Sequence, residues 1–154
     1  MPIAVLKLDH LVLTVADIEA TADWYSRVLG VTARRWRHAD GTKRASLYWT
    51  DEMIGNDKTA YKINLHRAGS EYEPHAARPT PGSADLCFIC YEAMSVVLAR
   101  LAACGVPIEM GPVWREGARD FLYSVYVRDP DGNLIELSEP GPGRNVDIEA
   151  MLGN

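Results

Sequence analysis

The sequence has little of what marks disulfide-rich, membrane-spanning or nucleic-acid-binding proteins. It contains only three cysteines in 154 residues, an odd number that argues against a framework of disulfides. Its apolar runs are too short to span a bilayer, and its first residues lack the basic start and cleavable apolar run of a signal peptide. The net charge of -5 opposes a general attraction to nucleic acid or to an anionic membrane. We therefore expect a cytoplasmic protein that binds neither nucleic acid nor membrane.

Two of the cysteines, Cys87 and Cys90, form a Cys-x-x-Cys motif inside an apolar run that is typical of a strand. Side chains three positions apart on a strand point to opposite faces, so these thiols could share neither a metal ion nor a disulfide. We interpret both as buried small hydrophobic residues.

An internal repeat organises the chain. Residues 9–15 form an apolar strand-like run, Asp17 is a candidate N-cap, and an amphipathic helix follows until Gly30 ends it. Adding 75 to each number gives a second strand-like run at 84–90, a second helix, and Gly105. The spacing from strand to helix to glycine is therefore the same in both halves. The apolar stripe expected on the first helix consists of Ile18, Ala22, Tyr25 and Leu29.

Each half continues with further strands and reads βαβββ. We place these strands at 31–37, 44–49 and 59–66 in the first half and, around a tight turn at 129–133, at 121–128 and 134–138 in the second. Modules of this size bury too little surface to be stable alone, so we expect one α+β domain, 1–154, whose two curved mixed sheets form a cup. Its parts are module one at 5–66, a linker at 67–82, module two at 83–139, and a tail at 140–154 with a short amphipathic turn at 146–152.

Strand alternation indicates which polar residues face the cup. His10 faces inward on the first strand, and its repeat mate in the second half is Asp85. The last strand of each half contributes further inward polar residues, namely Asn64, His66, Glu136 and Ser138. Each alone has an ordinary explanation, since an inward histidine is often a satisfied core residue and Asp85 or Glu136 could pair with Lys62 or an arginine. These polar side chains converge from four strands. Burying carboxylates and histidines together costs free energy unless a positive charge lies between them, so the pattern favours a bound divalent cation.

Several stretches resemble the vicinal oxygen chelate superfamily, which includes glyoxalase I, fosfomycin and bleomycin resistance proteins, methylmalonyl-CoA epimerase and extradiol dioxygenases. They are Leu-Asp-His-Leu-Val-Leu-Thr-Val at 8–15, Trp-Tyr with Val-Leu-Gly at 24–30, and Asp-Pro-Asp-Gly-Asn-Leu-Ile-Glu-Leu at 129–137. The stretches 62–66, 71–77 and 79–87 resemble more specifically the branch that contains glyoxalase-domain protein five and bacterial virulence-associated relatives. The resemblance runs from about Leu8 to Glu139.

The resemblance implies glyoxalase-like paired modules, usually a homodimer, and a divalent metal whose two open positions chelate adjacent oxygens of a small substrate. By position, His10 matches the first-strand histidine ligand and Glu136 the last-strand glutamate ligand. The family commonly has histidine where this chain has Asp85, and glutamate or another polar residue where it has Asn64. These two departures bear on the reaction.

A set of His10, Asp85 and Glu136 is harder than the two histidines and one carboxylate typical of iron-dependent oxygen chemistry. Among Mn, Ni, Zn, Mg and Fe, this set disfavours Fe, and with it a ring-cleaving dioxygenase, in favour of a metal-dependent lyase or isomerase. If His66 is also a ligand, the metal is held by two histidines and two carboxylates. This set is close to the four ligands of the superfamily's metal-dependent isomerases, and Glu136 or Asp85 would be the general base. The alternative is a non-catalytic drug- or metabolite-binding protein of the bleomycin-resistance kind, which needs no metal.

Other features have plainer interpretations. A basic cluster around the first hairpin is read as a solvated face and comprises Arg34, Arg35, Arg37, His38, Lys43 and Arg44. The segment 110–120, with Trp114, Arg115 and Arg119, is either a lid over the cup or an ordinary long loop. His75 is interpreted as a surface residue, and Tyr123 as either core or cup lining.

Overall fold

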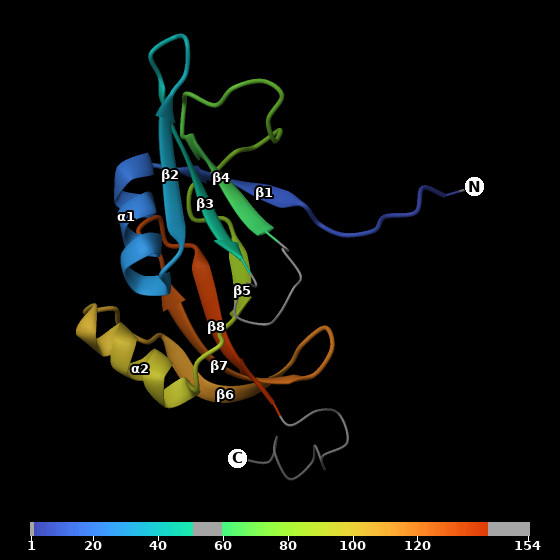
Figure 1. Ribbon diagram of the computed structural model, residues 1–154, viewed down its shortest axis with the longest axis vertical. Coiled ribbons are helices and arrows are strands. Elements are labelled where there is room, and N and C mark those ends of the chain that lie inside the picture. Colours follow the sequence, from blue (N-terminus) through green and yellow to red (C-terminus); the bar gives the residue numbers. More distant parts are fainter. Residues whose placement is uncertain (1, 51–59, 142–154) are drawn as a thin grey trace. The chain divides into compact units, whose positions relative to one another are not determined.

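The computed structural model describes residues 2–50 and 60–141 (Figure 1). The chain divides into two compact units, Met1–Pro81 and Gly82–Asn154, which we call unit 1 and unit 2. The amphipathic turn expected at 146–152 lies outside the described residues.

Unit 1 is a four-stranded mixed sheet with one helix on one face. Its elements are β1 (His10–Val15), α1 (Ile18–Leu29), β2 (Thr32–Arg37), β3 (Lys43–Thr50) and β4 (Ala60–Arg67). The strand order is β1-β4-β3-β2, with β1 parallel to β4 and the other pairs antiparallel. The connection from β1 through α1 therefore leads back to the same sheet, as a crossover helix does.

Helix α1 has the ends that the sequence predicts. The carboxylate of Asp17 accepts hydrogen bonds from the backbone N–H groups of Glu19 and Ala20, at 2.8 and 3.0 Å. Gly30 ends the helix in the left-handed conformation, with φ of 71°, which glycine adopts without a steric penalty. Val28 is buried and Leu29 only half-buried, so the apolar stripe runs one position earlier at this end than expected.

Unit 2 repeats the arrangement. Its elements are β5 (Asp85–Ile89), α2 (Met94–Ala103), β6 (Met110–Glu116), β7 (Phe121–Arg128) and β8 (Leu134–Pro140). The strand order, β5-β8-β7-β6, and the parallel pairing of the first two strands match unit 1 element for element. The prediction of an α+β fold built from paired βαβββ modules is confirmed.

Hydrogen bonds of the turn at 129–133, which joins β7 to β8, also reach the start of β5. Asp129 and Asn133 are both buried, and the carboxylate of Asp129 accepts from the backbone and the side-chain amide of Asn133, at 2.9 and 2.8 Å. The Asn133 side chain accepts in turn from the backbone N–H of Ala84, just before β5. Gly82 passes this turn so closely that a Cβ atom would lie 2.4 Å from the carbonyl oxygen of Asp131. The contacts hold the start of β8 beside the start of β5.

The segment 110–120 is neither a lid nor a long loop. Met110–Glu116 is the edge strand β6, which pairs antiparallel with β7, and only a short turn separates the two strands. A shift of register between Met110 and Val113 interrupts the pairing where Gly111 and Pro112 stand. An edge strand tolerates proline because one side of its backbone needs no partner, and a bulge absorbs the irregularity.

Each unit has its own apolar core between helix and sheet. In unit 1 it includes Leu13, Val15, Tyr25, Leu47, Ile63 and Leu65, and in unit 2 Val97, Leu101, Val125, Val127, Ile135 and Leu137. Neither of the described helices is long and apolar enough to cross a lipid bilayer. The polar residues expected at a site alternate with these core residues along the same strands, on the side of the sheet away from the helix.

Candidate functional site

We call the side of each sheet that its own helix leaves uncovered the open face of that unit. His10 begins β1 on the open face of unit 1, and its side chain is 41% exposed. Leu13 and Val15 lie on the opposite face, where they are buried against the helix. The strand alternation expected from the sequence is therefore present in β1.

A carboxylate holds the ring of His10. The Nδ1 atom of His10 lies 2.6 Å from Oδ1 of Asp9, and this hydrogen bond lowers the pKa of the Asp9 carboxyl. An ionised carboxylate only accepts, so Nδ1 carries a proton, and in the neutral imidazole Nε2 then presents its lone pair. Histidine ligands of metal ions are commonly oriented in this way by a carboxylate on the other ring nitrogen.

His66 lies at the other end of the same face. In the β1–β4 pairing His10 is opposite Lys62 and His66 is opposite Thr14, so four residues of strand, about 13 Å, separate the two histidines. His66 is only 3% exposed, and its Nε2 atom is buried with no hydrogen-bond partner among the described residues. Burial, followed by the charge of Arg44, lowers the pKa of His66.

Asn64 stands between them on β4. Its side-chain oxygen accepts a hydrogen bond of 2.7 Å from the hydroxyl of Ser46, the residue opposite it on β3. The superfamily commonly has glutamate or another polar residue at this position, and this chain has an amide. It supplies no negative charge to the open face of unit 1.

Glu136 is the centre of a polar cluster on the open face of unit 2. It lies on β8 between Cys87 of β5 and Tyr126 of β7, which are its partners across the two pairings. Its Oε1 atom lies 3.4 Å from the Ser138 hydroxyl, which in turn lies 2.9 Å from the hydroxyl of the buried Ser124. The carboxylate is half-buried, and no lysine, arginine or histidine of its unit forms an ion pair with it within the described residues.

Tyr126 is oriented by a cation. Nε of Arg115 donates to the Tyr126 hydroxyl at 3.1 Å, and the guanidinium carbon lies 5.6 Å from the centre of the Tyr126 ring. Burial, together with the nearby carboxylate of Glu136, raises the pKa of Tyr126 against the opposing effect of Arg115. The phenol therefore stays protonated and able to donate beside Glu136. This pair was not predicted, although the expected antiparallel strands before and after the turn at 129–133 place Tyr126 opposite Glu136.

Asp85 occupies the first position of β5 on the same open face. It is exposed and lies opposite Leu134, two positions before the Cys87–Glu136 pair. The two carboxylates are thus diagonal neighbours, about 8 Å apart at the backbone. Asp85 forms no ion pair with an arginine or lysine among the described residues of its unit, although its charge interacts with that of Arg128, whose closer partner is Glu109.

The Cys-x-x-Cys motif is not a joint site, but only one of its thiols is partly buried as expected. Cys87 is exposed on the open face, where its sulfur contacts the Ser138 hydroxyl at 3.4 Å, whereas Cys90 bonds weakly to the carbonyl of Phe88. Burial, together with the nearby carboxylate of Glu136, raises the pKa of the Cys87 thiol against the opposing effect of its hydrogen bond with Ser138, and burial raises the pKa of Cys90 to about 11. Both thiols are neutral at ordinary pH and are poor metal ligands in that form.

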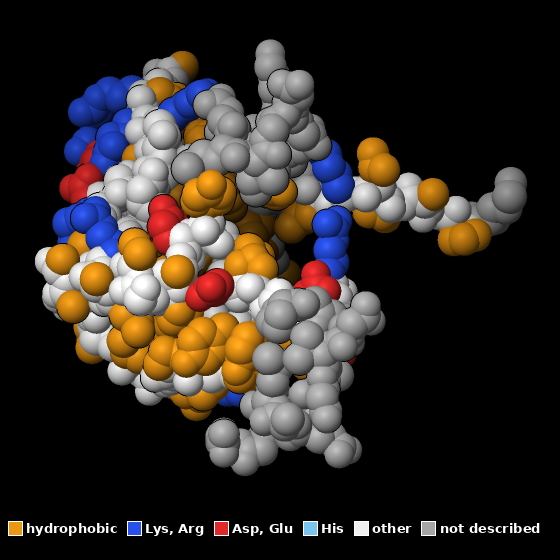
Figure 2. All heavy atoms as spheres, turned by 60° about the horizontal axis from the view of Figure 1, so that its bottom comes forward, with side chains coloured by type: hydrophobic (Ala, Val, Ile, Leu, Met, Phe, Trp, Pro, Cys, Tyr) orange, Lys and Arg blue, Asp and Glu red, His pale blue; other side chains and the backbone are white. Residues whose placement is uncertain are grey.

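The basic cluster is mostly the solvated face that the sequence suggests. Figure 2 shows Lys and Arg side chains gathered over the part of unit 1 that carries α1 and β2. Arg35 pairs with Glu19 and Asp23, and Arg37 donates to the carbonyl of Gly41. Arg44 differs, because it is buried on the open face and stacks on Tyr72.

The structure also shows where His75 and Tyr123 lie. His75 is a surface residue, as expected, with its Nδ1 atom 2.8 Å from the carbonyl of Ala76 and its Nε2 atom 3.3 Å from Glu73. Tyr123 pairs with Trp114 across β6 and β7, and their rings pack 4.9 Å apart. It shares a strand face with the buried Val125, and therefore lies on the helix side of the sheet.

The candidate metal residues are divided between the units. His10 and His66 belong to unit 1, and Asp85 and Glu136 to unit 2. Within the described ranges, no three His, Cys, Asp or Glu side chains are grouped as a metal ion requires. The local surroundings nevertheless suit a cation at two of them, because Asp9 orients the ring of His10 and Glu136 forms no ion pair among the described residues of its own unit.

The fold and these faces define a class of protein. Residues 7–137 match the sequence model of the glyoxalase/bleomycin resistance protein/dioxygenase superfamily, and the chain belongs to that superfamily. Its members commonly use divalent metals and are often dimers that bind small molecules.

Two named proteins are similar to this chain in sequence. The chain is 44% identical to virulence protein STM3117 of Salmonella typhimurium over 133 residues, which cover 86% of this chain and 83% of that protein. It is 41% identical to the glyoxalase domain-containing protein RDO1 of Mycosarcoma maydis over 136 residues, 88% of this chain and 69% of the relative. The crystal structure of the Salmonella protein matches 90% of this chain and 100% of its own with a TM-score of 0.75 at 42% identity.

Proposed function

We propose that this chain is a divalent-metal-dependent enzyme that acts on a small substrate bound through two adjacent oxygens. The observation that carries the proposal is the Asp9–His10 pair, in which the 2.6 Å hydrogen bond leaves Nε2 of a partly exposed histidine with a free lone pair. His10 also stands at the first-strand position where members of the superfamily place a histidine ligand.

The proposed ion is held by His10 and Glu136 with a third ligand. Asp85 suits that role better than His66, because it is exposed and a diagonal neighbour of Glu136 on the same face. His66 is about 13 Å along the strands from His10, and its Nε2 atom is buried. This ligand set takes residues from both units.

Such a set favours a lyase or isomerase over a ring-cleaving dioxygenase. One histidine and two carboxylates make a hard donor set, suited to Mn, Mg, Zn or Ni, whereas iron-dependent oxygen chemistry generally uses two histidines and one carboxylate. The bound ion would polarise a substrate carbonyl and make a neighbouring C–H group more acidic.

The residues around Glu136 fit a proton transfer. Glu136 is the proposed base, since its half-buried carboxylate lies on the open face without an ion pair among the described residues of its unit and would leave the metal to move the proton. Tyr126, oriented by Arg115, would donate a hydrogen bond to the Glu136 carboxylate or to a substrate oxygen. The neutral thiol of Cys87 and the hydroxyl of Ser138 line the same face without adding charge.

Deuterium exchange tests this function. The protein, supplied with Mn or Ni, is incubated in heavy water with a panel of thiohemiacetals and 2-hydroxy ketones, and exchange at the carbon beside the carbonyl is followed by proton NMR. We expect metal-dependent exchange with at least one of them, reduced about 100-fold or more by Glu136→Gln and little changed by Glu139→Gln.

Glu139 is a matched control because it carries the same group three positions along β8, where it binds the backbone N–H of Met94 and does not face Glu136. Stoichiometric binding of panel members with no exchange, with or without metal, would instead support the non-catalytic binding protein.

A further inference from the structure

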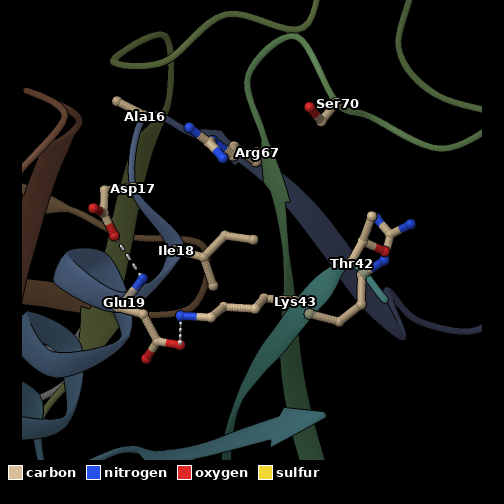
Figure 3. A pocket seen from close by; sticks show the side chains of 9 residues that line it. Ala16, Asp17, Ile18, Glu19, Thr42, Lys43, Arg67 and Ser70 are labelled. Atoms are coloured by element: carbon tan, nitrogen blue, oxygen red, sulfur yellow. Dashed lines mark hydrogen bonds and ion pairs between the residues drawn. The ribbon is translucent and has the colours of Figure 1, made fainter. Parts of the chain in front are cut away.

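Unit 1 contains a pocket that the proposed function does not use. It has a volume of about 300 Å³ and lies where β1 leads into the first turn of α1. Figure 3 shows Thr42 and Ser70 across from that turn, with Arg67 at the end of β4 and the side chain of Lys43 reaching toward Glu19. Six residues of strand, about 20 Å, separate His10 from Ala16 at this pocket, so the two sites are distinct.

The charges that line the pocket are unequal. Lys43, Arg44 and Arg67 contribute three positive charges, and Asp17 and Glu19 contribute two negative ones. Both carboxylates accept hydrogen bonds from other groups, although the charges of Arg67 and Lys43 also act on Asp17. Asp17 accepts from the backbone N–H groups of the first helical turn, and Glu19 accepts from Nε of Arg35 at 2.8 Å.

Lys43 is only loosely engaged by these carboxylates. Its Nζ atom lies 4.0 Å from Oε1 of Glu19, at the outer limit of an ion pair. The pocket therefore keeps an excess of positive charge that the described side chains do not balance.

Arg44 is the least compensated of the three cations. It is 9% exposed, and its guanidinium lies 3.9 Å from the centre of the Tyr72 ring. No carboxylate or carbonyl among the described residues accepts a hydrogen bond from it. Stacking engages the face of the guanidinium and leaves the N–H groups along its edge, which match the two oxygens of a carboxylate or phosphate.

His66 supports the same conclusion from the neighbouring strand. Its ring also lies 3.9 Å from the ring of Tyr72, and its Nε2 atom has no hydrogen-bond partner within the described part of the chain. A buried side-chain nitrogen without a hydrogen-bond partner is uncommon in a protein interior, and this one lies beside the largely buried Arg44.

We propose that this pocket binds a small oxyanion, a phosphate or a carboxylate group, with Arg44 as its principal contact. Lys43 and Arg67 add charge, and the hydroxyls of Thr42 and Ser70 can donate further hydrogen bonds from the opposite wall. The site adds an anion-recognition function to unit 1 and is independent of the metal ligands.

Titration of the full chain with inorganic phosphate, and separately with acetate, at low ionic strength tests the proposal. Backbone amide shifts of 42–44 and 67–70 are followed by NMR. We expect saturable one-to-one binding of at least one of the two anions, and the tighter one identifies the group recognised. Arg44→Gln should weaken it about tenfold or more, since a charge-assisted bidentate contact is lost.

Arg34→Gln is the matched control, because Arg34 also stacks on a tyrosine, Tyr48, of the same sheet but is exposed. Equal weakening by the two variants, or no saturable change at these amides with either anion, overturns the proposal. If Arg44→Gln does not fold, Arg67→Gln at the exposed end of β4 serves in its place, with an expected weakening that Arg34→Gln lacks. A normal metal content in the anion-binding variants would show that the two sites are separate.

Discussion

At the scale of single residues, His66 is a titratable side chain that is only 3% exposed. Its imidazole is buried against Tyr72, with Arg44 on the adjoining strand and with Glu71 and His75 as the other charged groups that act on it. Burial and Arg44 favour the neutral form, while Glu71 opposes them. His66 therefore links the stability of unit 1 to pH.

We predict that protonation of His66 destabilises the protein. Its folded pKa lies below the ordinary value of 6.5, so the unfolded chain binds the proton more tightly, and stability is lost as pH falls from 6.5 toward the folded pKa. Urea unfolding from about pH 7.5 to about pH 5.5 should show a smaller loss in His66→Gln than in the wild type.

His75→Gln is the control of opposite sign. The hydrogen bond to the carbonyl of Ala76 raises the pKa of His75, so its stabilisation is present below the ordinary pKa and is lost as pH rises through the folded one. Removing it should make the loss at low pH steeper. An unchanged pH dependence in His66→Gln would contradict the account.

How far these residues could be found from sequence depends on strand periodicity. His10, Asp85 and Glu136 follow from alternation along β1, β5 and β8, and the structure places each on the open face of its unit. Tyr72 could not be found, because it lies in the aperiodic segment that follows β4 in unit 1 and contacts Arg44 and His66 only in the folded chain. Cys87 was assigned to the interior because strand alternation does not tell which part of an open face remains uncovered.

At the scale of elements, the two helices begin in different ways. Asp17 caps α1 from within its own sequence, whereas Ala93 before α2 makes no side-chain cap. The first amide of α2 is instead bound by Oε2 of Glu139 at 2.6 Å, from a strand 45 residues further along the chain. A local sequence pattern predicts the first cap, but only the folded unit supplies the second.

This difference predicts opposite effects of cap variants. Asp17→Ala should lower the free energy of unfolding by about 1 kcal/mol, since it leaves two helical N–H groups without acceptors. Ala93→Ser should raise it by about 0.5 kcal/mol by adding an acceptor at an exposed N-cap position. Chemical denaturation of both variants checks the signs, and a stabilising Asp17→Ala would contradict the assignment of the cap.

Strand β6 shows why one element escaped prediction. Gly111, Pro112 and Gly117 interrupt the apolar pattern, and proline normally argues against a strand. The pairing to β7 recovers after a register shift, with Trp114 opposite Tyr123. The repeat of strand order in the two units, not the local pattern, is the evidence that a strand belongs there.

At the scale of the whole molecule, both sheets present unpaired edges. β1 and β2 end the sheet of unit 1, and β5 and β6 end that of unit 2. Apolar side chains are exposed on both open faces, among them Val12 at 45% and Ile89 at 57%. Edges and apolar surfaces of this kind favour pairing with another copy.

We therefore predict a homodimer, in agreement with the frequent dimers of the superfamily. Multi-angle light scattering at micromolar concentration should give twice the chain mass of 17.1 kDa. A monomer mass that persists as the protein is concentrated would contradict this prediction.

The central claim is that His10 and Glu136 bind one divalent ion. The metal content of untagged protein tests it after dialysis against Mn, Ni or Zn, measured by inductively coupled plasma mass spectrometry. We predict about one ion per chain in the wild type, and loss of the ion in His10→Ala and in Glu136→Gln with an unchanged circular dichroism spectrum. The exposed His38→Ala and the matched Glu139→Gln should keep it. Wild-type protein that retains no ion, or His10→Ala and Glu136→Gln variants that retain the full amount, would contradict the claim.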